Sequence, residues 1–176
     1  AFNELYKKGL VYEGFKVLAY CWRCETPLSN HELRMDDEVY KNRQDQSVSV
    51  TFPITEPGHE LDGVNLVAWT TTPWTLPTNF ALAVGPKIEY SVVSNKDGSA
   101  RYLMATSLIG GYAKELGYES AEELKAQITK SYLGTELNGL KYERIFDFYA
   151  NPELFDVRNA WQVLVADYVA DTDGTG

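Results

Sequence analysis

The stretch Trp69-Thr70-Thr71-Thr72-Pro73-Trp74-Thr75-Leu76-Pro77-Thr78-Asn79 is the most unusual part of this chain. It begins at the end of the apolar run 65–69 and leads directly into Phe80-Ala81-Leu82-Ala83-Val84, and both runs are typical of short buried strands. Pro73 and Pro77 fix their own φ angles and restrict the residue before each of them. The sequence therefore predicts a stiff, irregular loop that follows one strand, precedes another, and displays several hydroxyls and one amide.

The side chains of this loop do not titrate near neutral pH. Threonine hydroxyls and the asparagine amide both donate and accept hydrogen bonds, so they can orient a water molecule, a ribose hydroxyl or an ammonium group. Such a loop can position a hydrolytic water, although it contains no strong base of its own. The alternative interpretation is purely structural, because threonine is common in strands and proline commonly ends them.

Strand patterns dominate the rest of the chain. Apolar and polar residues alternate over 47–54, which is typical of a half-buried strand, and Pro53 indicates that this strand lies at an edge or a bulge. Further strands are predicted at 90–94, 101–105, 141–148 and 162–170, of which the first two flank a hairpin loop.

Short helices are predicted at the start of the chain and in its second half. Apolar residues recur at helical spacing over 108–116, with Gly117 just past the end, and Ser120 with Glu123 fits a capping box. Because no regular alternation of strand and helix occurs, the pattern favours an α+β domain. We expect it to be built on a predominantly antiparallel, barrel-like or sandwich-like arrangement with few short helices.

Cys21 and Cys24 form a Cys-x-x-Cys pair near the start of the chain. Two thiolates supply only half of a structural zinc site, which needs four ligands. His31 is a candidate third ligand, but we expect reduced thiols without a metal. We interpret residues 1–46 as a connective segment that contains this half of a zinc knuckle, and residues 47–176 as the main domain.

The polar stretch 32–46 includes Asp36-Asp37-Glu38, which we interpret as part of a charged surface loop rather than a metal site. The net charge of −9 argues against a general nucleic-acid binder, because phosphate contacts need a basic face. It does not exclude holding one nucleotide at the end of a long RNA. No apolar run approaches the ~20 residues of a membrane span, and the first residues lack the features of a signal peptide, so a cytoplasmic location is expected.

The stretch 69–79, with the apolar run 80–84, resembles the threonine-rich signature of isoleucyl-tRNA synthetase editing (CP1) domains. The valyl and leucyl relatives carry Thr-Thr-Arg-Pro at this place, so Thr72 indicates the isoleucine branch. The resemblance extends to 21–29, which is similar to the beginning of that family's zinc knuckle. It also includes 173–176, Asp-Gly-Thr-Gly, which is similar to the start of the family's Gly-Thr-Gly motif.

The resemblance implies proofreading inside a parent enzyme that ligates isoleucine to tRNA(Ile). Valine lacks one methylene of isoleucine, and a hydrophobic pocket gains only ~1–3 kcal/mol from a methylene, a limit for which this family is the standard illustration. A second site therefore hydrolyses valyl-tRNA(Ile) and excludes isoleucine by size. The implied substrate-binding residues are Thr70, Thr71, Thr72, Trp74, Thr75 and Asn79, and the catalytic ones among them are Thr71, Thr72 and Asn79.

The resemblance also sets expectations for cofactors and partners. Editing needs no cofactor, a structural zinc is expected only in the full-length parent, and ATP belongs to a synthetic domain whose signatures are absent from this sequence. In the family the Gly-Thr-Gly motif runs on into a histidine and an aspartate, so we expect a C-terminally truncated editing domain. The expected partners are the 3′ end of tRNA(Ile) carrying valine and the rest of the parent. The alternative function is a non-catalytic module that binds an aminoacyl-adenosine end or a small amino acid.

Overall fold

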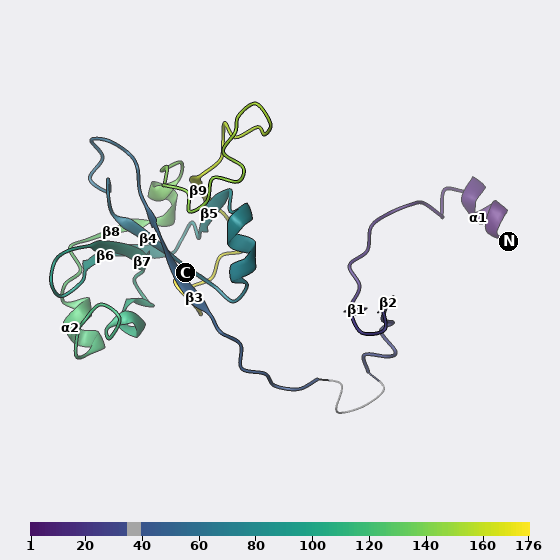
Figure 1. The fold of residues 1–176 in the computed structure, drawn as a ribbon, viewed down its shortest axis with the longest axis horizontal. Coiled ribbons are helices and arrows are strands. Elements are labelled where there is room, and N and C mark those ends of the chain that lie inside the picture. Colours follow the sequence, from purple (N-terminus) through teal and green to yellow (C-terminus); the bar gives the residue numbers. More distant parts are fainter. Residues whose placement is uncertain (35–39) are drawn as a thin grey trace. The chain divides into compact units, whose positions relative to one another are not determined.

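The computed structural model describes residues 1–34 and 40–176, so the acidic run Asp36-Asp37-Glu38 lies outside the described residues. The chain forms two compact units, Ala1–Gln44 and Asp45–Gly176, each of which is described by itself (Figure 1). From the sequence, the boundary between the two parts is expected after residue 46.

The first unit contains little regular structure. The helix α1 (Phe2–Lys7) confirms the helix predicted at the start of the chain, but none of its residues is buried. Two very short strands, β1 (Tyr20–Cys21) and β2 (Thr26–Pro27), pair antiparallel with Cys21 opposite Thr26. A short helix without a buried face gains no stability from packing. The described residues of this unit therefore hold the cysteine pair on a small hairpin and not on a hydrophobic core.

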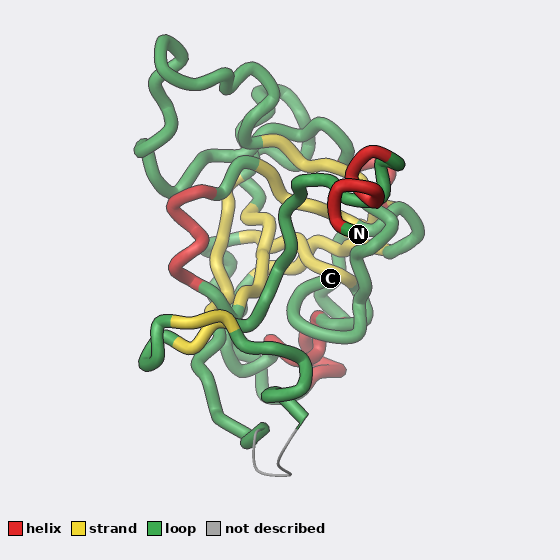
Figure 2. Tube along the Cα trace, turned by 90° about the vertical axis from the view of Figure 1, so that its right-hand side faces the viewer, coloured by secondary structure: helices red, strands yellow, loops and turns green. Residues whose placement is uncertain are grey.

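The second unit is organised around a five-stranded sheet whose strands run side by side in Figure 2. In spatial order its strands are β3 (Val48–Pro53), β4 (Asn65–Thr70), β7 (Arg101–Ala105), β6 (Glu89–Ser94) and β8 (Lys130–Leu133). Neighbouring strands are antiparallel except for β4 and β7, which are parallel. The edge position of β3 confirms the interpretation of Pro53, because a proline cannot donate a ladder hydrogen bond.

A second, two-stranded sheet joins β5 (Ala81–Val84) to β9 (Gln162–Val165) in parallel, with Leu82 opposite Val163. Isolated bridges link it to the larger sheet, because Tyr142 pairs with Ile54 beyond β3 while Lys141 pairs with Gln162. In the described part of the chain the larger sheet has two free edges, β3 and β8, and does not close into a barrel. The prediction is thus confirmed as a mixed α+β fold with few short helices, but not as an antiparallel barrel.

Alternate residues of the central strands enter two hydrophobic clusters on opposite faces of the sheet. The larger cluster includes Phe52, Ile54, Leu66, Leu82, Val84, Tyr90, Val92, Leu103, Tyr142 and Val163, and so joins both sheets. The smaller one includes Val67, Val93, Met104, Ile109, Leu116, Tyr118 and Leu124, and is completed by η2 (Ile109–Tyr112) and α2 (Ala121–Lys125). The central strands of the five-stranded sheet are therefore covered on both faces, whereas β3 and β8 at its edges are mostly exposed.

One predicted helix end is confirmed and two predicted elements are shorter in the structure. Ser120 accepts a hydrogen bond of 3.1 Å from the backbone of Glu123, as expected of a helix cap at α2. The helix predicted over 108–116 is only the 3₁₀ turn η2, which contains two successive glycines that weaken a helix. The strand predicted over 141–148 is limited to bridges at Lys141 and Tyr142, and beyond them the side chains of Arg144 and Asp147 pair at 2.6 Å.

Some short elements of the second unit were absent from the predictions. Among them, strand β8 forms the far edge of the larger sheet, and the 3₁₀ turn η3 (Gly134–Leu137) follows it directly. No helix among the described residues is long and apolar enough to cross a membrane.

Candidate functional site

The threonine-rich stretch is formed by the end of β4 and the 3₁₀ helix η1 (Pro73–Thr78), which replaces the predicted irregular loop. A proline occupies the first helical position, where its missing N–H costs no hydrogen bond. The hydroxyl of Thr75 donates to the carbonyl of Thr72 at 2.7 Å, and that of Thr78 donates to the carbonyl of Thr75 at 2.9 Å. Two of the threonines therefore stabilise the backbone of the helix itself.

Of the three threonines before the helix, two are hydrogen-bonded to each other and the third is exposed. The backbone N–H of Thr72 donates to the hydroxyl of Thr70 at 3.0 Å, and the two hydroxyls are 3.3 Å apart. Thr71 is exposed, and its hydroxyl makes no hydrogen bond within the part of the chain that the structure describes. Trp74 is 75% exposed. Thr71 and Trp74 are thus the predicted site residues most accessible to a ligand.

Asn79 is held at the C-terminal end of η1 by side chains that sequence reasoning missed. Tyr142 donates from its hydroxyl to Oδ1 of Asn79 at 2.7 Å, and Nδ2 of Asn79 donates to the carbonyl of Ala81 at 3.0 Å. The indole of Trp161 donates to the carbonyl of Asn79 at 3.2 Å. Burial raises the pKa of Tyr142 above its usual range, so this phenol keeps its proton into more alkaline solution than an exposed tyrosine does.

The segment 174–176 lies against the strand that leads into the threonines. A β-carbon built on Gly174 would lie 2.8 Å from Cε3 of Trp69, and the φ angle of Gly174 is +69°. The backbone N–H of Ala105 donates to the carbonyl of Thr175 at 2.9 Å, and Thr175 is only 5% exposed. The two stretches that carry the predicted resemblance, far apart in the sequence, therefore meet at the end of β4.

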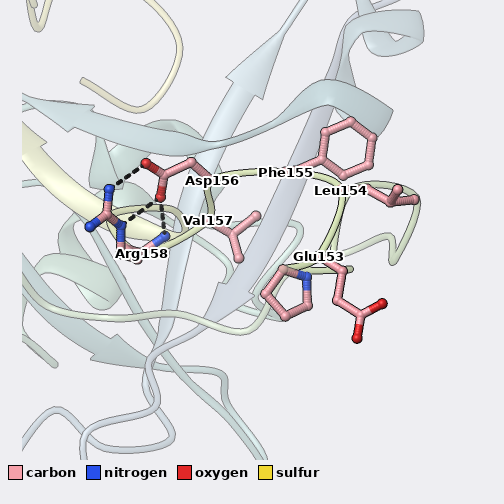
Figure 3. Close-up of a pocket in the computed structure, with 7 residues that line it drawn as sticks. Glu153, Leu154, Phe155, Asp156, Val157 and Arg158 are labelled. Atoms are coloured by element: carbon pink, nitrogen blue, oxygen red, sulfur yellow. Dashed lines mark hydrogen bonds and ion pairs between the residues drawn. The ribbon is translucent and has the colours of Figure 1, made fainter.

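Two hollows lie elsewhere in the second unit. One, of about 350 Å³, is lined by consecutive residues of a single loop, 152–158 (Figure 3). Two of its charged residues are paired with each other, since Nη2 of Arg158 lies 2.7 Å from Oδ2 of Asp156, and this guanidinium holds the pKa of Asp156 below its usual range. The other, of about 290 Å³, lies over β3, β4 and β7. Neither hollow is lined by any residue of the stretch 69–79.

The two cysteines of the first unit lie beside each other with free thiols. The backbone N–H of Cys24 donates to Sγ of Cys21 at 3.3 Å, and this hydrogen bond lowers the pKa of the Cys21 thiol. The thiol of Cys24 donates to Cys21, which raises the pKa of Cys24. Among residues 1–34 and 40–176, no three His, Cys, Asp or Glu side chains gather into a metal-binding group. His31 does not join the two cysteines in such a group among these residues, and zinc binding by the pair stays a prediction.

Comparison with known proteins shows the family to which this chain belongs. Residues 1–172 match the family described as tRNA synthetases class I (I, L, M and V). The chain belongs to this family. Relatives of this synthetase chain named isoleucine–tRNA ligase include one from Leifsonia xyli subsp. xyli, 53% identical over 193 residues, and one from Mycobacterium tuberculosis, 48% identical over 178 residues. Both alignments cover all of this chain, but only 17% and 16% of the respective relative.

The fold of this synthetase chain is also similar to that of a solved structure. "The crystal structure of GlLeuRS-CP1" superposes with a TM-score of 0.51 at 13% identity, over 74% of this chain and 51% of that chain. At such low identity the likeness concerns the fold alone. The resemblance to isoleucyl-tRNA synthetases that the threonine-rich stretch predicts is confirmed by the ligases that align with the whole chain.

Proposed function

We propose that the second unit of this class I tRNA synthetase chain hydrolyses the ester that joins valine to tRNA(Ile). The observation that carries the proposal is the contact between Trp69 and Gly174, which brings the segment 174–176 to the residue that directly precedes the threonines 70–72. A site of this kind corrects an error that a single hydrophobic pocket leaves, because one methylene distinguishes two amino acids by only ~1–3 kcal/mol.

The accessible groups suit the end of an aminoacylated RNA. The exposed ring of Trp74 offers a face on which an adenine base or an aliphatic side chain can pack, and the open hydroxyl of Thr71 offers both a donor and an acceptor. Thr70, Thr72 and Thr75 preorganise this surface through their own hydrogen bonds. We assign substrate binding to these residues, with Thr71 and Thr72 closest to the reacting ester.

Asn79 has limited capacity for the role expected of it. Its Oδ1 already accepts from Tyr142 and one Nδ2 hydrogen is donated to Ala81, which leaves one N–H and one lone pair for a substrate. Tyr142 therefore fixes the orientation of the Asn79 amide in any contact with the ester. We propose that Asn79 contributes mainly through this fixed geometry.

Hydrolysis follows direct attack of an oriented water molecule. The water oxygen bonds to the ester carbonyl carbon and the bond to the ribose oxygen breaks. One proton of the water goes to the ribose oxygen, the other is released to solvent, and valine leaves as its carboxylate. Threonine hydroxyls are very weak acids and are unsuited to act as nucleophiles unless a base activates them. The hydroxyls therefore orient the water and stabilise the charge that develops on the carbonyl oxygen.

The proposed reaction needs a tRNA substrate and the rest of the enzyme. The substrate is the 3′ end of tRNA(Ile) carrying valine, the remainder of a ligase holds the body of the tRNA, and the reaction belongs to cytoplasmic protein synthesis. Cys21 and Cys24 would hold a structural zinc in the complete enzyme if two further ligands join them. That ion has no part in hydrolysis.

A second candidate is a binding module that retains an aminoacyl-adenosine end without cleaving it. It is favoured by the internal engagement of Thr70, Thr75 and Asn79, whose polar groups largely support the backbone of the site. The two functions differ in turnover and not in affinity. Retention of a non-hydrolysable valyl-adenosine analogue without ester cleavage would therefore identify the binding module.

The decisive experiment measures deacylation of valyl-tRNA(Ile) and isoleucyl-tRNA(Ile). This chain is assayed by itself and within the Leifsonia xyli ligase, where residues 1–176 replace the aligned segment. Hydrolysis of the valyl ester alone by the chimaera supports the proposal. A chimaera that folds, charges tRNA with isoleucine and leaves both esters intact contradicts it.

A further inference from the structure

Trp69 is the residue of β4 against which the segment 174–176 packs. Its backbone pairs with Ser49 of β3, so the edge strand holds the tryptophan in register. A β-carbon on Gly174 would lie 2.8 Å from Cε3, 3.0 Å from Cδ2 and 3.1 Å from Cβ of Trp69. Such distances leave no room for a side chain, so the backbone of Gly174 lies directly against the tryptophan side chain.

The second contact of this segment is with the end of β7. Strands β4 and β7 pair only at Asn65 with Tyr102 and at Leu66 with Leu103. Beyond that point, Ala105 donates its N–H to the carbonyl of Thr175 at 2.9 Å, and a β-carbon on Gly176 would lie 2.3 Å from Cβ of Ala105. The segment 174–176 therefore contacts the ends of both strands where their own pairing stops.

We propose that Trp69 is a positioning residue that sets the spacing between the threonines 70–72 and the segment 174–176. This inference rests on the proposed function, since the spacing would determine which amino-acid side chain the site admits. Discrimination by a single methylene needs walls that are fixed to within a fraction of an ångström. A tryptophan side chain has only two rotatable bonds. Although Trp69 is 41% exposed, its backbone is paired within the sheet and its side chain lies against Gly174, so it can act as such a spacer.

Gly174 and Trp69 form a complementary pair that can be tested from either side. Trp69→Ala removes the spacer and lets the segment approach β4 or lose its order, whereas Trp69→Phe retains an aromatic face. Gly174→Ala inserts a methyl group against the ring and pushes the segment away. Gly98 is the matched control, because its φ of +72° imposes the same backbone strain but nothing lies within 4 Å of its β-carbon position.

The test measures kcat and KM for valyl- and isoleucyl-tRNA(Ile) deacylation in the Leifsonia xyli chimaera, together with melting temperatures. We expect Trp69→Ala to reduce the valyl-over-isoleucyl preference in kcat/KM at least tenfold, on the order of the discrimination that one methylene gives. The KM for the tRNA should stay within threefold of the parent. Trp69→Phe should keep most of the preference, and Gly174→Ala should change it far more than Gly98→Ala.

The outcomes separate this inference from the function on which it rests. A parent chimaera that cleaves neither ester overturns both. A parent that cleaves only the valyl ester, with an unchanged preference in Trp69→Ala and Gly174→Ala, overturns the positioning role and leaves the function in place. If Trp69→Ala does not fold, Trp69→Phe and Gly174→Ala decide the question: equal effects of Gly174→Ala and Gly98→Ala would then overturn the positioning role.

Discussion

Tyr142 and Asn79 are joined by a hydrogen bond of 2.7 Å from the phenol to the amide oxygen, although 62 other residues separate them in the chain. Tyr142 also pairs through its backbone with Ile54, and its ring meets Phe52 edge-on with ring centroids 5.2 Å apart. One tyrosine thus ties the end of the threonine-rich helix to the larger sheet and to the core. The geometry of the candidate site depends on the packing of this side chain.

Removing the phenol should destabilise the second unit without changing its fold. Tyr142→Phe leaves Oδ1 of Asn79 without its donor in a half-buried place, which costs about 1–2 kcal/mol of unfolding free energy. Denaturant unfolding measures the change, with Tyr168→Phe as control because Tyr168 is 83% exposed. Equal stability of the two variants would show that the hydrogen bond does not stabilise the native state.

The threonines should separate into structural and functional groups. Thr75→Val removes the hydroxyl that donates to the carbonyl of Thr72, and should lower the unfolding free energy by about 0.5–1.5 kcal/mol. Thr71→Val removes an open, exposed hydroxyl and should leave stability within about 0.5 kcal/mol of the parent, while it lowers valyl-ester cleavage in the chimaera. Loss of stability in Thr71→Val with unchanged cleavage would reverse the assignment.

Two glycines of the second unit should respond in opposite ways to alanine. A β-carbon on Gly134 would lie 2.1 Å from the carbonyl oxygen of Gly85, so Gly134→Ala should cost about 2–4 kcal/mol through a shift of the backbone. Nothing lies within 4 Å of the β-carbon position of Gly111, so Gly111→Ala should be neutral or stabilise by up to about 1 kcal/mol. Thermal unfolding of both variants tests the contrast, which similar melting temperatures would contradict.

The cysteine pair should react unequally with an alkylating reagent. The pKa of Cys21 is lowered by the backbone N–H of Cys24, whereas the pKa of Cys24 is raised by its hydrogen bond to Cys21. At pH 7–8 more of Cys21 is therefore thiolate, and iodoacetamide should modify it first in chelator-treated protein. As the pH rises through the pKa of Cys24, both thiols ionise and the ratio of rates should fall.

Peptide mass mapping at several pH values measures this ratio. Cys24→Ser supplies the control, because it removes the partner thiol but retains the backbone N–H that is the first cause of the lowered pKa. Preferential modification of Cys24 at pH 7–8 would contradict the expected order.

The strands were predictable wherever a local pattern carried the information. The alternation over 47–54 and the apolar runs at 65–69 and 80–84 correspond to β3, β4 and β5. Such patterns can be recognised because they depend only on residues that are close together in the sequence. Their partners were not predictable. The parallel pairing of β4 with β7 and of β5 with β9 joins distant segments, and no neighbouring residue specifies it.

The candidate site shows the same division. The threonine-rich stretch was recognisable because its composition and its resemblance are local, whereas the stiffness inferred from its two prolines stays a prediction. Its engagement by Tyr142 and Trp161 was missed, since a tyrosine in a predicted strand and a lone tryptophan carry no signal of the amide they contact. The 3₁₀ helix was missed too. It is stabilised by hydroxyls that donate to carbonyls three residues earlier, and threonines at this spacing are equally compatible with a loop.

The pairing of Ala81–Val84 with Gln162–Val165 has a consequence for how the protein is made. A ribosome releases β5 long before β9, so the nascent chain carries a strand whose partner has not been synthesised. Tyr142 and Trp161, which hold Asn79, also arrive late. The threonine-rich helix must therefore wait, partly uncovered, until nearly the whole unit has left the ribosome. Its support therefore comes late in the synthesis of this unit, and a chain interrupted before Tyr142 lacks the donor to Asn79.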